Sequence, residues 1–182
     1  IPYIWQGGMA IQGGIIFACI AAYFYLKKHQ IPVLPFADTV TPGIILGQAI
    51  GRIANFMNGD AFGHPTGQDF GLLYPDTTLA YHTYGAQPLW PAEVWECQGD
   101  LLIFVLLLWY GCKTRAEGTT FCLYIMFYSL LRFFLENYRG DYGTLALGLK
   151  SAQLTSLAAF AGAFILFLYF HFKHKSKSGI SE

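Results

Sequence analysis

The stretch from Ser151 to Phe172 reads SAQLTSLAAFAGAFILFLYFHF and contains no Asp, Glu, Lys or Arg. A helix crosses the roughly 30 Å hydrocarbon core of a bilayer with about 20 mostly apolar residues, so this stretch predicts a transmembrane helix. The whole chain fits that prediction, because 54% of its 182 residues are hydrophobic and only 12% are charged. A soluble globular domain carries about twice that charged fraction. Eleven basic and eleven acidic residues balance, so the chain lacks the basic excess typical of a nucleic-acid-binding protein.

Four other apolar stretches reach a similar length, and three of them contain charged side chains. They are Gly7–Leu26, Val33–Phe56, Leu89–Cys112 and Gly118–Tyr138. The sequence therefore predicts an all-α fold, a polytopic membrane helical bundle of about five transmembrane helices. Lys and Arg gather near the cytoplasmic ends of such helices. Basic clusters follow the first, third and fifth stretches, which predicts a cytoplasmic C-terminus.

The segment between the second and third spans, residues 57–88, lacks a bilayer-length apolar run and is rich in turn-forming residues. We expect it to form an external loop cap, or lid. One integral membrane domain is expected over residues 1–178, with a polar tail at 179–182. The chain begins with Ile1 and shows no signal-peptide pattern, and we expect an N-terminal part of the protein to precede it. The four cysteines show no metal-ligand spacing, so no metal site and no cofactor are expected.

Charged side chains inside the predicted spans are the main functional signal. Each costs about 2.5–3.5 kcal/mol at the bilayer centre on insertion scales, so they should face one another or a hydrated cavity. Glu93, Glu96 and Asp100 form an acidic stripe in the third span. Arg132 and Glu136 are four residues apart in the fourth span and share one helix face. Two interpretations stay open: buried ion pairs that only fix helix packing, or a polar functional site.

A second polar motif lies near the external end of the second span. Arg52, Asn55 and Asn58 recur every three residues, and a glycine-rich exit follows at Gly59 and Gly63. A guanidinium can bind two oxygens of a phosphate at once, and glycine lets backbone N–H groups come close to it. The pattern therefore predicts a phosphate-binding site.

The run Gly51–Gly63, GRIANFMNGDAFG, closely resembles the signature G-R-x-[GA]-N-F-x-N-x-E-x-x-G of the prolipoprotein diacylglyceryl transferase family. Further matches flank this run. They are WQGGMAIQGG at Trp5–Gly14, the acidic Asp38, the block R-x-x-x-E-x-x-R-x-D from Arg132 to Asp141, and SAQLTSL at Ser151–Leu157. The resemblance covers essentially the whole chain, and it corresponds to the C-terminal two-thirds of a family member with seven spans.

The resemblance implies an enzyme of lipoprotein maturation in the bacterial cytoplasmic (inner) membrane, with its active site toward the periplasm and without a cofactor. The implied reaction transfers the diacylglyceryl group from phosphatidylglycerol to the lipobox cysteine thiol in a prolipoprotein signal peptide, and releases glycerol phosphate. Membrane lipid is the other implied partner, and no nucleic acid is expected.

Residue roles follow from the same resemblance. Fixed cations would stabilise the extra negative charge of the leaving phosphate, and Glu136 would orient Arg132. The residues implied in catalysis are Arg52, Arg132, Glu136 and Asp60. Those implied in substrate binding are Asn55, Asn58, Gly63, Gln12, Gly13, Gly14, Asp38, Glu93 and Arg139.

The chain departs from the family pattern where histidine recurs. Gln12 and Trp90 stand at the two histidine positions, Asp60 replaces the signature's glutamate, and Glu93 replaces a glutamine. Glutamine and tryptophan do not accept a proton near neutral pH. Either another group, with Glu93 or Asp60 best placed, deprotonates the thiol, or the chain is a divergent paralogue that binds phospholipid or lipoprotein without the transfer. A third hypothesis, a transport pathway, gives no reason for the glycine-bearing signature.

Overall fold

The structure is a computed structural model that describes residues 11–112, 116–140 and 150–178. Its elements are α1 (Ile11–Lys28), α2 (Val33–Asn58), α3 (Leu79–Tyr84), α4 (Ala92–Gly111), α5 (Thr119–Leu135), the 3₁₀ helix η2 (Glu136–Tyr138) and α6 (Ser151–Ser178). The described part contains isolated β-bridges and no strand, which confirms the predicted all-α fold. Each of the five predicted spans corresponds to one long helix.

Three of the described helical segments are long and apolar enough to cross a membrane. They are Val33–Asn58, Thr119–Tyr138 and Ser151–Lys175. The chain is thus an all-α membrane protein. α4 has 20 residues, and it differs from these three in carrying the carboxylates of Glu93, Glu96 and Asp100.

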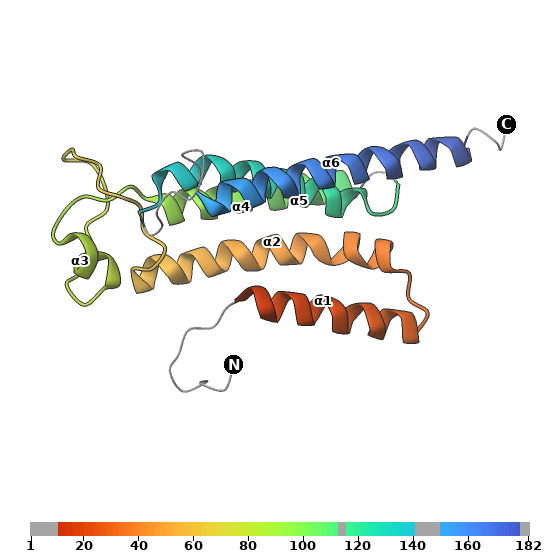
Figure 1. Ribbon diagram of the computed structural model, residues 1–182, viewed down its shortest axis with the longest axis horizontal. Helices are drawn as coiled ribbons and strands as arrows, with labels where there is room; N and C mark the ends of the chain where they lie inside the picture. Colours follow the sequence, from red (N-terminus) through yellow and green to blue (C-terminus); the bar gives the residue numbers. More distant parts are fainter. Residues whose placement is uncertain (1–10, 113–115, 141–149, 179–182) are drawn as a thin grey trace.

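The long helices lie side by side along one axis, with α1 on the outside of α2 (Figure 1). α2 packs against α4, α4 against α5, and α5 against α6. Ile45, Ile103 and Leu107 form the apolar centre of the bundle. Gly99 on α4 faces Leu131 on α5, and a Cβ at residue 99 would lie 2.5 Å from the Leu131 side chain. Glycine at this position therefore lets α4 and α5 approach closely.

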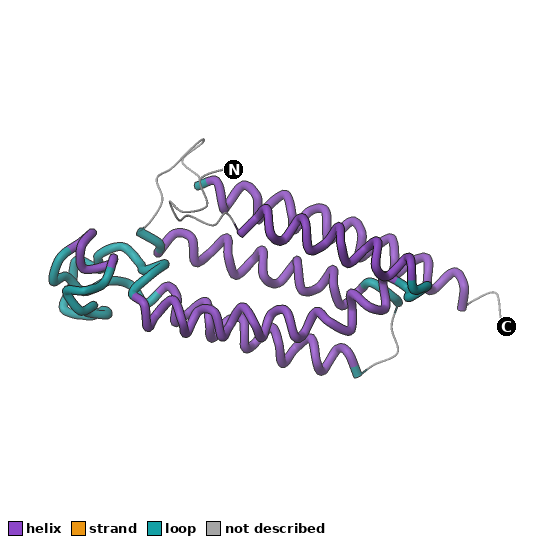
Figure 2. Tube along the Cα trace, turned by 90° about the horizontal axis from the view of Figure 1, so that it is seen from below, coloured by secondary structure: helices purple, strands orange, loops and turns teal. Residues whose placement is uncertain are grey.

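Residues 59–91, including α3, form a cap at one end of the bundle (Figure 2). α2 ends where the cap begins. Gly59 is left-handed (φ 69°), and its amide donates to the Phe56 carbonyl, while the Asp60 amide donates to the Asn55 carbonyl. This hydrogen-bond pattern at a helix end favours glycine. The helix continues to Asn58, so the cap starts two residues later than the sequence predicts.

Asp38 on α2 holds the start of α5. Its Oδ2 accepts a hydrogen bond from the Gly118 amide at 2.7 Å, and its Oδ1 accepts one from the Phe121 amide at 2.9 Å. The carboxylate thus binds N–H groups that the helix leaves free and faces the positive end of its dipole. Fourteen residues separate Asp38 from Arg52 on the same helix, a distance of about 21 Å. Asp38 therefore lies away from the predicted phosphate site.

Replacing Asp38 by Asn is expected to lower the thermal unfolding temperature of the detergent-solubilised protein. The amide removes the charge and one of the two acceptors, and helix caps of this kind contribute about 0.5–2 kcal/mol. Calorimetry measures the shift. The matched control is Asp76→Asn at an exposed cap position, which should leave the unfolding temperature unchanged. Equal unfolding temperatures for the two variants would contradict the capping role.

Candidate active site

Glu96 on α4 is the centre of a buried group of ion pairs. Its Oε1 lies 2.6 Å from Nη2 of Arg52 on α2, and its Oε2 lies 3.4 Å from Nη1 of Arg132 on α5. Nη1 of Arg139, which follows η2, is 3.6 Å from the same Oε2. The Tyr128 hydroxyl donates to Oε1 at 3.4 Å. Three guanidinium groups therefore converge on one carboxylate. Solvent does not reach this carboxylate, because Glu96 is only 1% exposed.

Glu136 supplies the second carboxylate. Its Oε2 is 2.9 Å from Nη2 of Arg132, as the four-residue spacing predicts. We call these residues the arginine cluster: Arg52, Glu96, Arg132, Glu136 and Arg139. The cluster contains three guanidinium and two carboxylate groups, and the carboxylates of Glu93 and Asp100 also act on Arg52. The side chains of Arg52 and Arg132 keep 20% and 16% of their surface exposed, so these two guanidinium groups are accessible to an anion.

The start of α6 fixes the turn that carries Arg139. Lys150 Nζ donates to the carbonyl of Glu136 at 2.8 Å and to that of Arg139 at 2.6 Å. Gln153 Nε2 donates to Asn137 Oδ1 at 3.0 Å. Sequence reasoning assigns neither Lys150 nor Gln153 to a site. The signals it offers are that Lys150 is the last charged residue before the uncharged span and that Gln153 lies in the SAQLTSL match to the family pattern.

The cap closes over this end of the bundle through Gly63 and His64. The His64 amide donates to the Tyr138 carbonyl at 2.9 Å, and the Trp90 amide donates to the His64 carbonyl at 3.0 Å. Gly63 forms an antiparallel bridge with Arg139. A Cβ on residue 63 would collide with the Trp90 carbonyl. Glycine at residue 63 therefore lets the Trp90 backbone lie close to the segment that bridges to Arg139.

Two further carboxylates lie on α4 on either side of Glu96. Glu93 and Asp100 are fully buried, and neither accepts a hydrogen bond from another described residue. Burying a carboxylate without a partner costs free energy. Both residues are therefore candidates for a chemical rather than a structural role.

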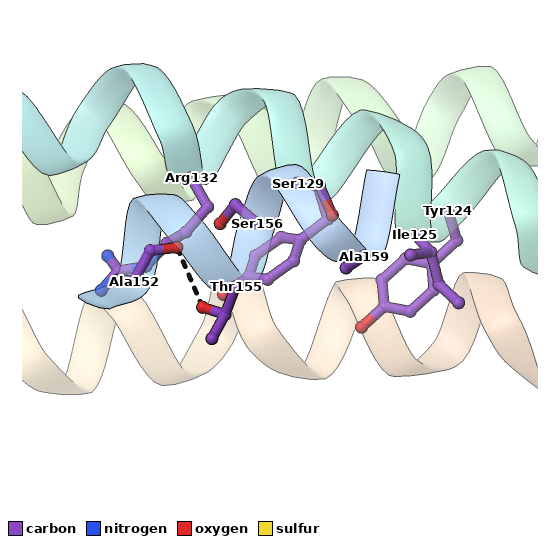
Figure 3. Close-up of a pocket in the computed structure, with 9 residues that line it drawn as sticks. Tyr124, Ile125, Ser129, Arg132, Ala152, Thr155, Ser156 and Ala159 are labelled. Atoms are coloured by element: carbon purple, nitrogen blue, oxygen red, sulfur yellow. Dashed lines mark hydrogen bonds between the residues drawn. The ribbon is translucent and has the colours of Figure 1, made fainter. Parts of the chain in front are cut away.

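A pocket of about 330 Å³ lies between α5 and α6, with Arg132 at one end and Tyr124 at the other (Figure 3). Its walls include the small residues Ala152 and Ala159 on α6. The Thr155 hydroxyl in this pocket donates back to the Ala152 carbonyl at 3.0 Å (Figure 3), so it is already used. The pocket gives a molecule bound at Arg132 space to extend along the helices.

The structure brings four of the predicted site residues into one cluster and leaves others apart. Those brought together are Arg52, Arg132, Glu136 and Arg139. Glu96, the common partner of the three arginines, belongs to the predicted acidic stripe. Asn55 is half-buried, one turn beyond Arg52, and Asn58 is exposed at the end of α2.

The remaining predicted residues lie outside the cluster or outside the described residues. Asp60 is half-buried at the start of the cap. Gly13 and Gly14 lie on α1, where a Cβ on either would meet no atom within 4 Å. The side chain of Gln12 lies outside the described residues, as do most of the Trp5–Gly14 motif and Asp141.

The fold and the site define a class: an all-α membrane protein in which helices assemble a buried arginine–carboxylate centre beneath a loop cap. The chain matches the family described as prolipoprotein diacylglyceryl transferase over residues 1–169. It belongs to that family.

Similar proteins carry the name phosphatidylglycerol–prolipoprotein diacylglyceryl transferase. The one from Halalkalibacterium halodurans is 34% identical over 169 residues, which cover 92% of this chain and 58% of that protein. The one from Nostoc is 39% identical over 165 residues, covering 87% and 58%. The one from Clostridioides difficile is 38% identical over 177 residues, covering 97% and 66%. The chain therefore spans less than two-thirds of the length of these relatives.

Replacing Glu96 by Gln is expected to destabilise the protein strongly. The substitution leaves three guanidinium groups facing one another without their shared carboxylate, and breaking a buried ion pair costs about 3–5 kcal/mol. Thermal unfolding in detergent measures the loss. Glu117→Gln removes the same charge at an exposed position and should have little effect. Should Glu96→Gln unfold at the wild-type temperature, Glu96 does not organise the arginines.

Proposed function

We propose that the protein containing this chain transfers the diacylglyceryl group of phosphatidylglycerol to the lipobox cysteine thiol of a prolipoprotein signal peptide, and releases glycerol phosphate. The observation that carries the proposal is the arginine cluster, in which three guanidinium groups meet and two of them, those of Arg52 and Arg132, stay partly exposed. Membership of the family supports the same reaction.

The chemistry of this reaction matches the cluster. The cysteine sulfur attacks a glyceryl carbon and forms a C–S bond, while the C–O bond to the phosphate breaks. The leaving phosphate monoester carries more negative charge than the phosphodiester of the lipid. Fixed cations aimed at that phosphate therefore stabilise the transition state more than the ground state. Arg52 and Arg132 are the partly exposed cations of the cluster, and we assign them this role.

The other cluster residues position these two arginines. Glu136 orients Arg132 through its ion pair. Glu96 holds both arginines, and Arg139 adds positive charge. Asn55 and Asn58 continue the face of α2 that carries Arg52, where their amides can hydrogen-bond phosphate or glycerol oxygens. The reaction also needs a proton acceptor, because thiolate is the nucleophile.

We further propose five membrane spans, with α1 and α4 crossing beside the other three, in one domain over residues 1–178. The carboxylates of α4 lie inside the bundle. Its outer face instead presents apolar side chains, since Leu102, Val105 and Trp109 are 61%, 59% and 62% exposed. α1 has 18 residues, a length of about 27 Å, close to the thickness of the hydrocarbon core.

The proposed location is the bacterial cytoplasmic membrane, with the cap and the arginine cluster on the periplasmic side. Lys27 and Lys28 end α1, and Lys173 and Lys175 lie near the end of α6. Both ends lie opposite the cap (Figure 1). Because basic residues favour the cytoplasmic side, this arrangement supports a cytoplasmic C-terminus.

A lipid- or lipoprotein-binding paralogue without transferase activity is the second candidate function. The observation that favours it is Trp90, an indole that cannot accept a proton at a position where histidine recurs in the family pattern. Its ring packs against Trp95 and Tyr138 at centroid distances of 5.6 and 5.4 Å. A bulky apolar side chain at this position is as compatible with binding a lipid as it is with catalysis.

Replacing Arg52 by Ala in the full protein is expected to reduce transfer to a lipobox peptide by at least about 100-fold, the effect of removing one charge-stabilising donor. Arg52→Lys should recover only part of the rate, because an ammonium lacks the two-pronged guanidinium geometry. Lys28→Ala, at the opposite end of the bundle, is the control. Full activity of Arg52→Ala would refute the role of Arg52.

Complementation separates the two candidate functions. The full protein is expressed in a bacterial strain depleted of its own prolipoprotein diacylglyceryl transferase, and lipoprotein modification is followed. The transferase function predicts restored modification by the wild type and none by Arg52→Ala. A well-inserted wild-type protein that binds phosphatidylglycerol but restores no modification would favour the binding function.

A further inference from the structure

We infer that Glu93 is the proton acceptor for the substrate thiol, an inference that rests on the proposed transferase function. Glu93 lies in the first turn of α4, one turn closer to the cap than Glu96. It is fully buried, and its carboxylate accepts no hydrogen bond from another described residue. A proton acceptor needs a free carboxylate close to the reacting groups, and Glu93 meets both conditions.

The other buried carboxylates of the bundle are less suited to this role. Glu96 and Glu136 are both held by guanidinium groups at 2.6 and 2.9 Å, so their carboxylates are already engaged in ion pairs. Asp100 also accepts no hydrogen bond from another described residue, but it lies seven residues further along α4, about 10 Å deeper in the bundle. Among the buried carboxylates of the described residues that have neither an ion pair nor a hydrogen bond to another residue, Glu93 thus lies nearest the cap.

The surroundings of Glu93 suit the arrival of a thiol beside a phosphate. The charged groups that act on it are Arg52 from α2, Arg139 after η2, and Glu96 on its own helix. One of these, Arg52, is assigned to the leaving phosphate, and Arg139 belongs to the same arginine cluster. A thiol that approaches from the cap end would therefore meet the proton acceptor and the leaving group in the same space.

The cap limits water at this position. Trp90, three residues before Glu93, packs against Trp95 and Tyr138, and the rings of Trp95 and Tyr138 lie 5.2 Å apart. The Trp90 amide also bonds to the His64 carbonyl. Since bulk solvent does not reach Glu93, a thiol at this position depends on a protein group to remove its proton.

The proposed step balances. The thiol proton moves to a Glu93 oxygen, the sulfur electron pair forms the C–S bond, and the electron pair of the broken C–O bond goes to the phosphate oxygen. The proton then passes from Glu93 to the phosphate monoester, which leaves with it. Glu93 is again ionised at the start of the next turnover.

The test compares Glu93→Gln, Glu93→Asp, Asp60→Asn and His64→Gln in the full protein, with phosphatidylglycerol and a lipobox peptide as substrates. Initial rates are measured between pH 6 and 10. Glu93→Gln should be at least about 100-fold slower near pH 7, within the range for loss of a general base. Its deficit should shrink as pH rises toward the thiol pKa of about 8.5, because the thiol then ionises unaided. Glu93→Asp should retain more activity than Glu93→Gln.

A second substrate isolates the proton step. A peptide with selenocysteine at the lipobox position carries a selenol, which ionises more readily than a thiol, so Glu93→Gln should recover most of the wild-type rate with it. Glu93→Gln is expected to fold, since no hydrogen bond to another described residue is lost. A deficit that is the same at every pH and with both peptides, or this pH signature in Asp60→Asn or His64→Gln instead, would overturn the inference. An inactive wild type would contradict the proposed function itself.

Discussion

The buried carboxylate of Glu96 holds together the segments that form the site. Three arginines from α2, α5 and the turn after η2 meet on it, and it is the carboxylate that all three share among the described residues. A charged side chain in this environment is expensive unless it is paired. The ion pairs bring three guanidinium groups to one position. Two of these groups stay partly exposed, and in the proposed function they bind the phosphate of an anionic lipid.

Two contacts at opposite ends of α5 keep this geometry in place. At one end, Asp38 on α2 holds the first turn of α5. At the other end, Lys150 binds the backbone carbonyls of Glu136 and Arg139. Together they fix the position of Arg132 along the bundle and the direction in which Arg139 turns back. The cap contacts the same turn. The contacts that close the cap over the site therefore also hold the backbone of Arg139 in place.

Much of the fold could be predicted from the sequence, because apolar length alone identifies where the five long helices lie. The Arg132–Glu136 pair could also be predicted, since four-residue spacing is a local property of helices. The partnership of Glu96 with Arg52 joins residues 44 apart, and no local pattern encodes it. The same applies to Asp38: its place inside a span suggests function, whereas its partners are amides on a helix 80 residues later.

A double-mutant cycle between Arg52 and Glu96 measures whether Glu96 assembles the arginines. The free energy of unfolding in detergent is measured for the wild type, Arg52→Met, Glu96→Gln and the double variant. If Glu96 assembles the arginines, removing it costs less once Arg52 is gone, and the coupling should be at least about 1 kcal/mol. Effects that add within about 0.3–0.5 kcal/mol would contradict the account.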